Sequence, residues 1–186
     1  QKMKIVSEPL PGLFLLEPSV FGDERGYFFE SWNHGKFCEL IQKEVHFVQD
    51  NQSLSGKGVV RGLHLQAPPF AQGKLVRVVR GTVLDIALDI RKNSPTYGKH
   101  FSAELSEKNH RMMWIPEGFA HGFSVLEDQT IFLYKCTNFY NKASEHCIRY
   151  NDSALNINWK TEQAIVSEKD KEGLLLSDFE SPFTYV

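Results

Sequence analysis

The chain has 186 residues, of which 41% are hydrophobic and 24% are charged. This composition is that of a globular protein, and the length suits one domain, which we expect over residues 3–186. The net charge of −2 argues against a nucleic-acid partner, since such surfaces carry clustered positive charge. The apolar runs are far shorter than the roughly 20 residues that span a bilayer, so no membrane partner is expected.

Short strands dominate the predicted elements. In chain order, apolar patterning away from the central region predicts strands at Gly12–Pro18, Tyr27–Trp32, Phe101–Leu105, Met112–Ile115, Gly122–Val125 and Ile131–Thr137. One helix is expected early in the chain, after a possible N-cap at Ser31 or Asn33. Its apolar residues, at positions i, i+3, i+4 and i+8, are Phe37, Leu40, Ile41 and Val45.

The clearest strand pattern is Thr82–Ile90, TVLDIALDI. Its large apolar residues share one parity while Asp85 and Asp89 share the other, which predicts a strand buried on one face. The preceding run KLVRVVRG alternates in the same way and ends at Gly81, so the two runs predict a hairpin. Many short strands and one helix favour an all-β fold, and we expect a double-sheet jelly roll of the cupin type with a few short helices.

The three cysteines, Cys38, Cys136 and Cys147, are an odd number with no CxxC spacing. This pattern argues against a disulfide framework and against a thiolate zinc site. A reducing, cytoplasmic location fits it best.

A motif near the middle of the chain bears on metal binding. In IPEGFAHGF, Pro116, Gly118 and His121 have the PxGxxH spacing of the second half-motif of cupin barrels. Metal-binding cupins add an HxH pair in the first half-motif, because a metal ion needs about three protein ligands. Here the corresponding strand, RGLHLQ, offers only His64. We therefore expect no metal at this site.

The segments RGLHLQ, GKLVRVVRG, AHGF and FLYK, in this order, strongly resemble the dTDP-4-dehydrorhamnose 3,5-epimerase family of deoxysugar biosynthesis. The resemblance extends from about Gly12 to Asp170. It implies a β jelly roll, usually a homodimer, with no metal or dissociable cofactor. It also implies a nucleotide-sugar substrate, a dTDP-linked 4-keto-6-deoxyhexose, inverted at C3 and C5.

The resemblance implies roles for individual residues. His64 would be the general base, Asp170 the carboxylate that orients it, Tyr134 the opposing acid and Lys74 the cation that stabilises the enolate. The positions implied to hold nucleotide, diphosphate and sugar are Arg25, Glu30, Gln49, Asn51, Arg61, His121, Tyr140, Glu145 and Lys169. Tyr140 would stack on the thymine ring, and Phe28 is an alternative platform.

Physical chemistry supports this set of residue types. A hydrogen beside a ketone becomes acidic only if the enolate oxygen is stabilised, which a cation such as Lys74 can do. Imidazole exchanges protons near neutral pH, and a tyrosine hydroxyl is protonated at pH 7. Arginine can bind phosphate bidentately, and Arg25 and Arg61 are candidates.

Two departures leave the sugar specificity open. Leu65 stands where an aromatic residue is common in the family. The stretch that resembles DYY in the family reads Asn138-Phe139-Tyr140 here. The alternatives are an epimerase of one centre, a 3,4-ketoisomerase or a non-catalytic cupin that binds a sugar nucleotide. Tyr134 argues against a ketoisomerase, which returns the proton to the neighbouring carbon without an opposing acid. An intact base, acid and cation argue against mere binding.

Overall fold

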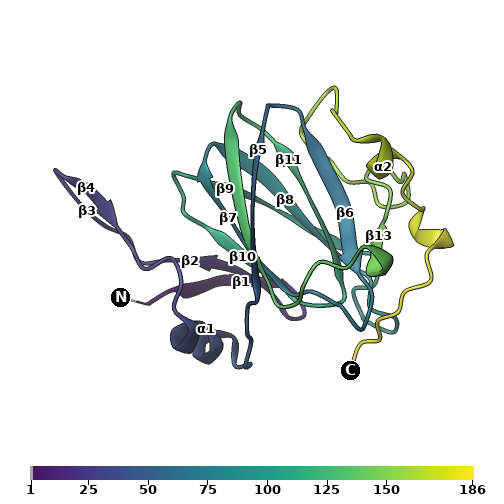
Figure 1. Cartoon of the computed structure of the whole chain (residues 1–186), viewed down its shortest axis with the longest axis horizontal. Coiled ribbons are helices and arrows are strands. Elements are labelled where there is room, and N and C mark those ends of the chain that lie inside the picture. The colour runs from purple at the N-terminus through teal and green to yellow at the C-terminus, as the bar shows by residue number, and fades with distance from the viewer. Residues whose placement is uncertain (1) are drawn as a thin grey trace.

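Two antiparallel sheets packed face to face make up the body of the computed structural model, which describes residues 2–186 (Figure 1). The six-stranded sheet has the order β1 (Lys4–Leu10), β2 (Leu13–Glu17), β10 (Met112–Ile115), β7 (Lys74–Arg80), β12 (Thr130–Cys136) and β5 (Gln49–Ser55). The five-stranded sheet has the order β13 (Glu145–Cys147), β6 (Val60–Gln66), β11 (Phe119–Val125), β8 (Thr82–Asp89) and β9 (His100–Ser106). Strands distant in sequence are neighbours, as in a jelly roll. The predicted fold class is confirmed.

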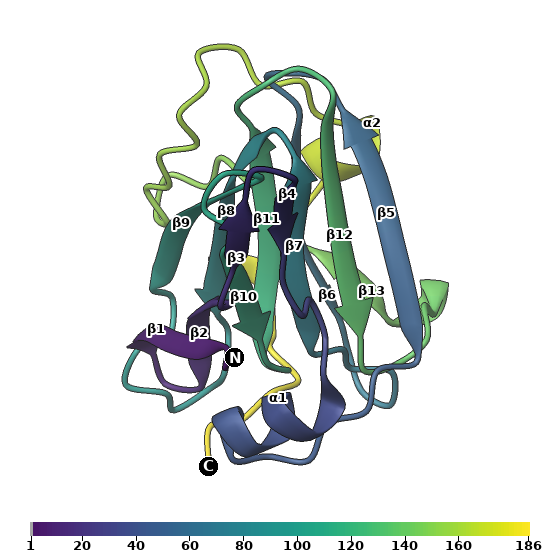
Figure 2. The same ribbon diagram turned by 90° about the vertical axis from the view of Figure 1, so that its left-hand side faces the viewer.

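The smaller elements lie outside the two sheets. The hairpin of β3 (Phe21–Asp23) and β4 (Gly26–Phe28) projects from the body, and α1 (His34–Ile41) lies below the hairpin (Figures 1 and 2). The C-terminal segment carries α2 (Glu168–Lys171) and two 3₁₀ turns occur, η1 (Lys142–Ser144) and η2 (Leu176–Asp178). Among residues 2–186, no helix has the length and apolar character needed to cross a bilayer.

Three apolar clusters hold these layers together. The first fills the space between the sheets and includes Val76 and Phe132. The second joins the outer face of the five-stranded sheet to the C-terminal segment, where Trp159 packs. The third packs α1 against the six-stranded sheet through Phe37 and Trp114. Burial of such apolar surface is the main stabilising contribution to the fold.

The prediction that strand β8 is buried on one face only is wrong. Asp85 and Asp89 are completely buried, as are Ile86 and Leu88 on the other parity. The cause is that the C-terminal segment covers the outer face, while the inner face points between the sheets. Asp85 and Asp89 are therefore buried polar residues of β8 and do not form a solvent-exposed face.

The predicted hairpin of β7 and β8 is also wrong. Strand β7 pairs with β10 and β12 in one sheet, whereas β8 pairs with β9 and β11 in the other. Gly81 lies between them with a positive φ of 81°, and a Cβ there would clash with Thr130. The glycine thus turns the chain from one sheet into the next.

Two boundaries near the N-terminus also differ from the prediction. The strand expected over Tyr27–Trp32 ends at Phe28, because only β3 is available to pair with it. The helix begins as expected after an Asn33 cap, but ends at Ile41, where Gln42 adopts a left-handed conformation. Val45 therefore packs into the core from the following loop.

Candidate active site

The site lies between the two sheets, and strand register determines which side chains face it. His64 on β6 and His121 on β11 are directly paired positions, so their side chains project from the same face of the sheet. The ring of His121 stacks on Phe132 of the opposite sheet, with centroids 6.0 Å apart. His64 therefore points toward the interior of the sandwich.

His64 and Asp170 form a close pair. The Nε2 atom of His64 lies 2.6 Å from Oδ1 of Asp170. The side chain of His64 is 32% exposed, whereas that of Asp170 is 6% exposed. The other ring nitrogen, Nδ1, is left for a ligand. The structure thus joins two residues that are 106 positions apart in the sequence.

Local backbone geometry holds Asp170 in place. Ser167 caps α2 by accepting a hydrogen bond from the backbone N–H of Asp170, and the N–H of Gly62 donates to Oδ2 at 3.0 Å. Burial alone would raise the pKa of Asp170, but the hydrogen bonds from His64 and Gly62 outweigh it and lower the pKa. Asp170 is therefore held as a carboxylate.

Gly62 has a second role in the packing of the site. A Cβ at this position would lie 2.7 Å from the Cα of Gly122, so the two backbones approach more closely than a side chain allows. The glycines of RGLHLQ and AHGF thus let β6 and β11 pack tightly beside His64.

The opposite sheet contributes Tyr134, Lys74 and Asn51 to the interior. Tyr134 on β12 is paired with Asn51 on β5 and with Val76 on β7. The Nζ atom of Lys74 lies 5.6 Å from the centroid of the Tyr134 ring. Burial lowers the pKa of Lys74 and raises the pKa of Tyr134, because both charged forms lose hydration.

A second histidine–aspartate pair lies deeper in the sandwich. His121 Nε2 is 2.6 Å from Oδ1 of Asp85, and both side chains are buried. Burial lowers the pKa of His121 and raises the pKa of Asp85, despite their mutual attraction. Sequence reasoning identified His121 but not Asp85 as a site residue. The only sequence signal was an aspartate within an otherwise apolar strand.

A chain of polar contacts forms the rim of the site. The hydroxyl of Tyr140 donates to Glu145 at 2.7 Å, and the same carboxylate oxygen lies 2.8 Å from Nζ of Lys169. The backbone N–H of Tyr140 donates to Gln49, whose own amide donates to Asn51. Five of the predicted binding residues are thus connected, with Tyr140 itself 55% exposed.

Two further residues support this rim. Buried Gln66 donates to the carbonyls of Phe70 and Phe139 and accepts from the N–H of Asn141, so it fixes the loop that carries Tyr140. Arg61 donates to Ser55 on the opposite sheet at 3.0 Å. Gln66 was not predicted as a site residue, and its two-residue spacing from His64 was the available signal.

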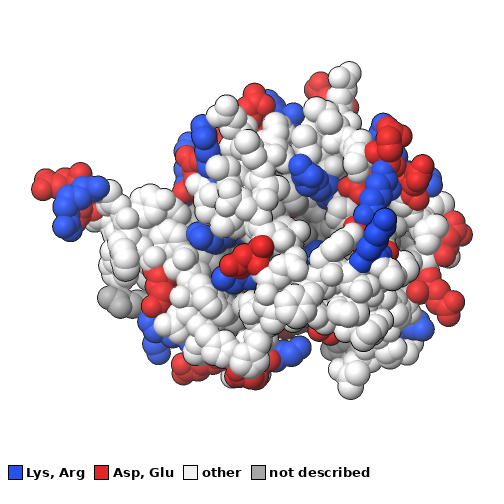
Figure 3. All heavy atoms as spheres, viewed as in Figure 1, with Lys and Arg blue, Asp and Glu red and all other residues white. Residues whose placement is uncertain are grey.

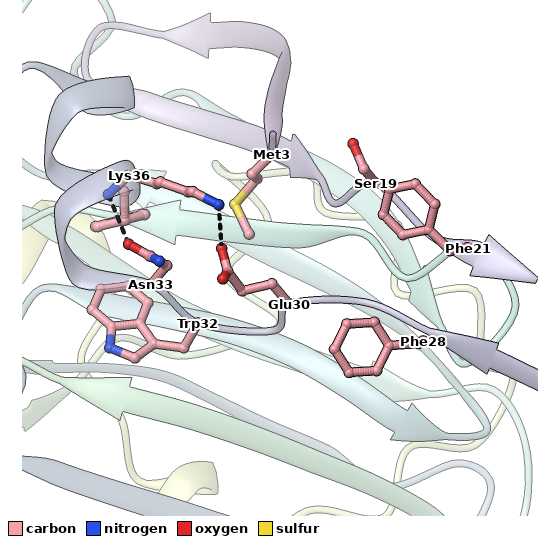
Figure 4. A pocket seen from close by; sticks show the side chains of 9 residues that line it. Met3, Ser19, Phe21, Phe28, Glu30, Trp32, Asn33 and Lys36 are labelled. Carbon is pink, nitrogen blue, oxygen red and sulfur yellow. Dashed lines mark hydrogen bonds and ion pairs between the residues drawn. The ribbon is translucent and has the colours of Figure 1, made fainter. Parts of the chain in front are cut away.

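Three predicted binding residues lie apart from His64. Arg25 is at the tip of the β3–β4 hairpin, where its exposed side chain pairs with Asp23. Glu30 pairs with Lys36 at 3.1 Å beside Phe28 in a hollow of about 60 Å³ at the start of α1 (Figure 4). This hollow is much smaller than the roughly 300–1,000 Å³ of ligand pockets. Within one chain, these residues do not contribute to the His64 site.

Charge is mixed over the face shown in Figure 3. Basic side chains border the hollow at its centre, with acidic ones interspersed. Such a surface presents local cations to an anionic small ligand without a continuous basic patch.

Comparisons with known proteins agree with this geometry. A family model described as dTDP-4-dehydrorhamnose 3,5-epimerase matches residues 7–178. The chain belongs to this family. The dTDP-4-dehydrorhamnose 3,5-epimerase of Shigella flexneri is 52% identical over 171 residues, covering 92% of this chain and 94% of that protein. Membership confirms the resemblance drawn from RGLHLQ, AHGF and FLYK.

Two further members mark the range of the dTDP-4-dehydrorhamnose 3,5-epimerase family. The crystal structure of dTDP-6-deoxy-D-glucose-3,5-epimerase from Legionella pneumophila, in complex with dTDP-4-keto-L-rhamnose, has a TM-score of 0.92 at 46% identity, covering 96% of this chain and 95% of that chain. The dTDP-4-dehydrorhamnose 3-epimerase of Streptomyces niveus is 34% identical over 169 residues, covering 91% of this chain and 82% of that protein. The family thus includes proteins named for two centres and for one.

Proposed function

We propose that this chain is an isomerase that inverts C3 and C5 of a dTDP-linked 4-keto-6-deoxyhexose, giving dTDP-4-dehydrorhamnose for rhamnose biosynthesis. Family membership supports the reaction class. The observation that carries the mechanism is that His64 and Tyr134 project from opposite sheets toward one interior. Inversion needs a base and an acid on opposite faces of the sugar, which this arrangement supplies.

His64 acts as the base through Nδ1. With Asp170 held as a carboxylate 2.6 Å from Nε2, the neutral imidazole carries its proton on Nε2 and offers the lone pair of Nδ1. Proton abstraction from C3 or C5 then produces an imidazolium, which the Asp170 carboxylate stabilises. Asp170 is a positioning residue in this scheme, because it acts through His64.

Lys74 and Tyr134 complete the chemistry. The electrons of the broken C–H bond move to the 4-keto oxygen, and the ammonium of Lys74 stabilises the resulting enolate. The hydroxyl of Tyr134, kept protonated by its raised pKa, then delivers a proton to the other face of the carbon. Each inversion leaves His64 as an imidazolium and Tyr134 as a tyrosinate, and proton transfer from His64 to solvent and from solvent to Tyr134 restores both before the next centre reacts.

The rim residues hold the nucleotide. Tyr140 is exposed enough to stack on the thymine ring, and Glu145 and Gln49 fix its orientation. Arg61 and Lys169 supply positive charge for the diphosphate. His121 and Asn51 contact the sugar from the interior side.

We also propose that the protein is a homodimer, with the β3–β4 hairpin packed across the subunit interface and Arg25 reaching the nucleotide of the partner. Tyr27 and Phe28 on this hairpin are 62% and 73% exposed, which is unusual for aromatic residues. Light scattering should give twice the chain mass, and Arg25→Ala should raise KM. A monomer with full activity would contradict this arrangement.

One assay tests the reaction. The protein is incubated with dTDP-4-keto-6-deoxyglucose in deuterated water, and the label at C3 and C5 is measured. Label with inversion at both carbons is expected. Label at one carbon only would favour a single-centre epimerase, transfer of the ketone to C3 would favour a 3,4-ketoisomerase, and no label with tight binding would favour a non-catalytic cupin.

We also propose a cytoplasmic location, where the three free cysteines of the protein stay reduced.

A further inference from the structure

A group of metal-binding side chains lies outside the candidate active site, where α1 is followed by the chain leading to β5. His34 Nε2 and His46 Nε2 lie 3.0 and 3.1 Å from the same oxygen, Oε1 of Glu44. The two imidazole rings are stacked, with centroids 4.9 Å apart and planes 24° apart. The Sγ atom of Cys38 lies 4.0 Å from Nε2 of His34. The ligand atoms of His34, Cys38 and Glu44 thus converge, and His46 joins them through Glu44 and the ring of His34.

Local structure explains this convergence. His34 and Cys38 are four residues apart on α1, so they share one face of the helix. Gln42 then adopts a left-handed conformation, and the N–H of Lys43 donates to the carbonyl of Cys38. The chain therefore reverses directly after the helix and brings Glu44 back to the face that carries Cys38.

We propose that His34, Cys38, Glu44 and His46 form a zinc site. Zinc takes four ligands in a tetrahedron, at about 2.0–2.3 Å from nitrogen, oxygen and sulfur, which places the ligands about 3.3–3.8 Å apart. The ligand atoms of His34, Cys38 and Glu44 already lie within 4.8 Å of one another. Imidazole and thiolate favour zinc over magnesium or calcium, which prefer oxygen ligands.

The exposure of these side chains favours metal uptake. The side chains of His34, Glu44 and His46 are 45%, 65% and 73% exposed, so they can adjust and the ion can enter from solvent. Among the described residues, one other comparable group, His64, Cys147 and Asp170, is part of the candidate active site. There, burial raises the pKa of the Cys147 thiol to about 12, which disfavours a thiolate ligand.

The zinc site has a structural consequence. It would tie α1 to the segment leading into β5, the strand that carries Gln49 and Asn51 at the rim of the candidate active site. If zinc binds the folded state and not the unfolded state, it stabilises the fold. The bound ion takes no part in proton transfer, because its ligands lie outside the interior that contains His64.

Zinc binding can be measured with the full chain after treatment with a chelator and dialysis. Titration against a chromophoric zinc chelator should give one zinc per chain. Thermal unfolding should give a higher Tm for the zinc-loaded protein than for the zinc-free protein. His46→Ala, Glu44→Gln and Cys38→Ser should each weaken binding by at least about tenfold, since even indirect partners of metal sites contribute that much. Cobalt substitution should show a thiolate-to-cobalt absorption band in the wild-type protein, absent in Cys38→Ser.

Matched variants serve as controls. His146→Ala removes an exposed histidine elsewhere and Glu39→Gln an exposed acid on α1 that is not a proposed ligand, and both variants should bind zinc like the wild type. All these variants should epimerise at the wild-type rate with or without zinc, which also shows that they fold. No zinc binding tighter than about millimolar, or binding abolished by Cys147→Ser and unchanged in His46→Ala, would overturn the site. Wild-type affinity in Cys38→Ser would overturn the four-ligand assignment.

Discussion

Among residues 2–186, two histidine–aspartate pairs have the same 2.6 Å separation but different surroundings. The His64–Asp170 pair opens to the interior of the site, with the His64 side chain 32% exposed. The His121–Asp85 pair is closed, with side chains 6% and 0% exposed. The equal distances therefore do not distinguish the pair that we propose as catalytic from the more deeply buried one.

The two carboxylates, of Asp170 and Asp85, also differ in hydrogen bonding and in the direction of their pKa shifts. Both oxygens of Asp170 accept hydrogen bonds, one from His64 and one from Gly62, and its pKa is lowered. Oδ2 of Asp85 is buried without a hydrogen-bond partner among the described residues, and burial raises its pKa. Hydrogen bonding thus keeps the first pair ready to carry charge, whereas desolvation pushes the second toward its uncharged form.

Replacement of His64 should have the largest effect on activity. His64→Ala removes the only proposed proton acceptor, so inversion and deuterium exchange should both fall by about 10²–10⁴-fold. The measurements are epimerisation rate and label at C3 and C5. His146→Ala, an exposed histidine on the neighbouring strand, is the control. If His121→Ala abolished exchange while His64→Ala did not, the roles of the two pairs would be reversed.

Replacement of Tyr134 should separate the two faces of the sugar. Tyr134→Phe keeps the aromatic ring and removes the hydroxyl, so inversion should fall by about 10²–10⁴-fold while His64 still exchanges the proton with solvent. Exchange with retained configuration, detected by label without inversion, is the expected signature. An inversion rate equal to that of the wild type would show that Tyr134 only packs between the sheets and is not the acid.

Replacement of Asp85 should affect stability more than chemistry. Asp85→Ala leaves buried His121 without its partner, and an unsatisfied buried polar group costs about 1–3 kcal/mol. Urea unfolding should show this loss, while Asp85→Asn, which can still accept from His121, should lose less. The fall in turnover should be smaller than for His64→Ala. Equal losses of turnover would mean that the deep pair shares the catalytic role.

The sequence was sufficient to predict the fold class and the family, whereas the roles of the site residues stay predictions. His64, Tyr134 and the jelly roll itself were predicted from strand patterning and from the order of RGLHLQ, AHGF and FLYK. Asp85 was not, because its burial depends on the opposite sheet and on its pairing with His121 across strands. Contacts between distant segments leave little trace in local periodicity.

The same limit explains the other differences. The hairpin of β7 and β8 was mispredicted because alternation shows that two runs are strands but not which strands they pair with. The cluster at His34 was not predicted because the cysteine spacing gave no sign of it, whereas the reversal after α1 brings histidine and glutamate side chains to Cys38.

The smallest predicted effect is a pH dependence of stability with opposite sign for the two aspartates. The folded pKa of Asp170 lies below the ordinary value of 3.8, so the unfolded chain binds its proton more readily, and the stabilisation that Asp170 provides is lost as the pH falls below about 4. The folded pKa of Asp85 lies above 3.8, so its contribution instead decreases as the pH rises from about 4. Urea unfolding of the wild type, Asp170→Asn and Asp85→Asn between pH 3 and 7 measures both differences. The wild-type advantage over Asp170→Asn should shrink toward pH 3, and that over Asp85→Asn should shrink toward neutral pH. Slopes of the same sign would show that the two pairs do not differ in charge state, and the open pair would then have no electrostatic advantage as the catalytic one.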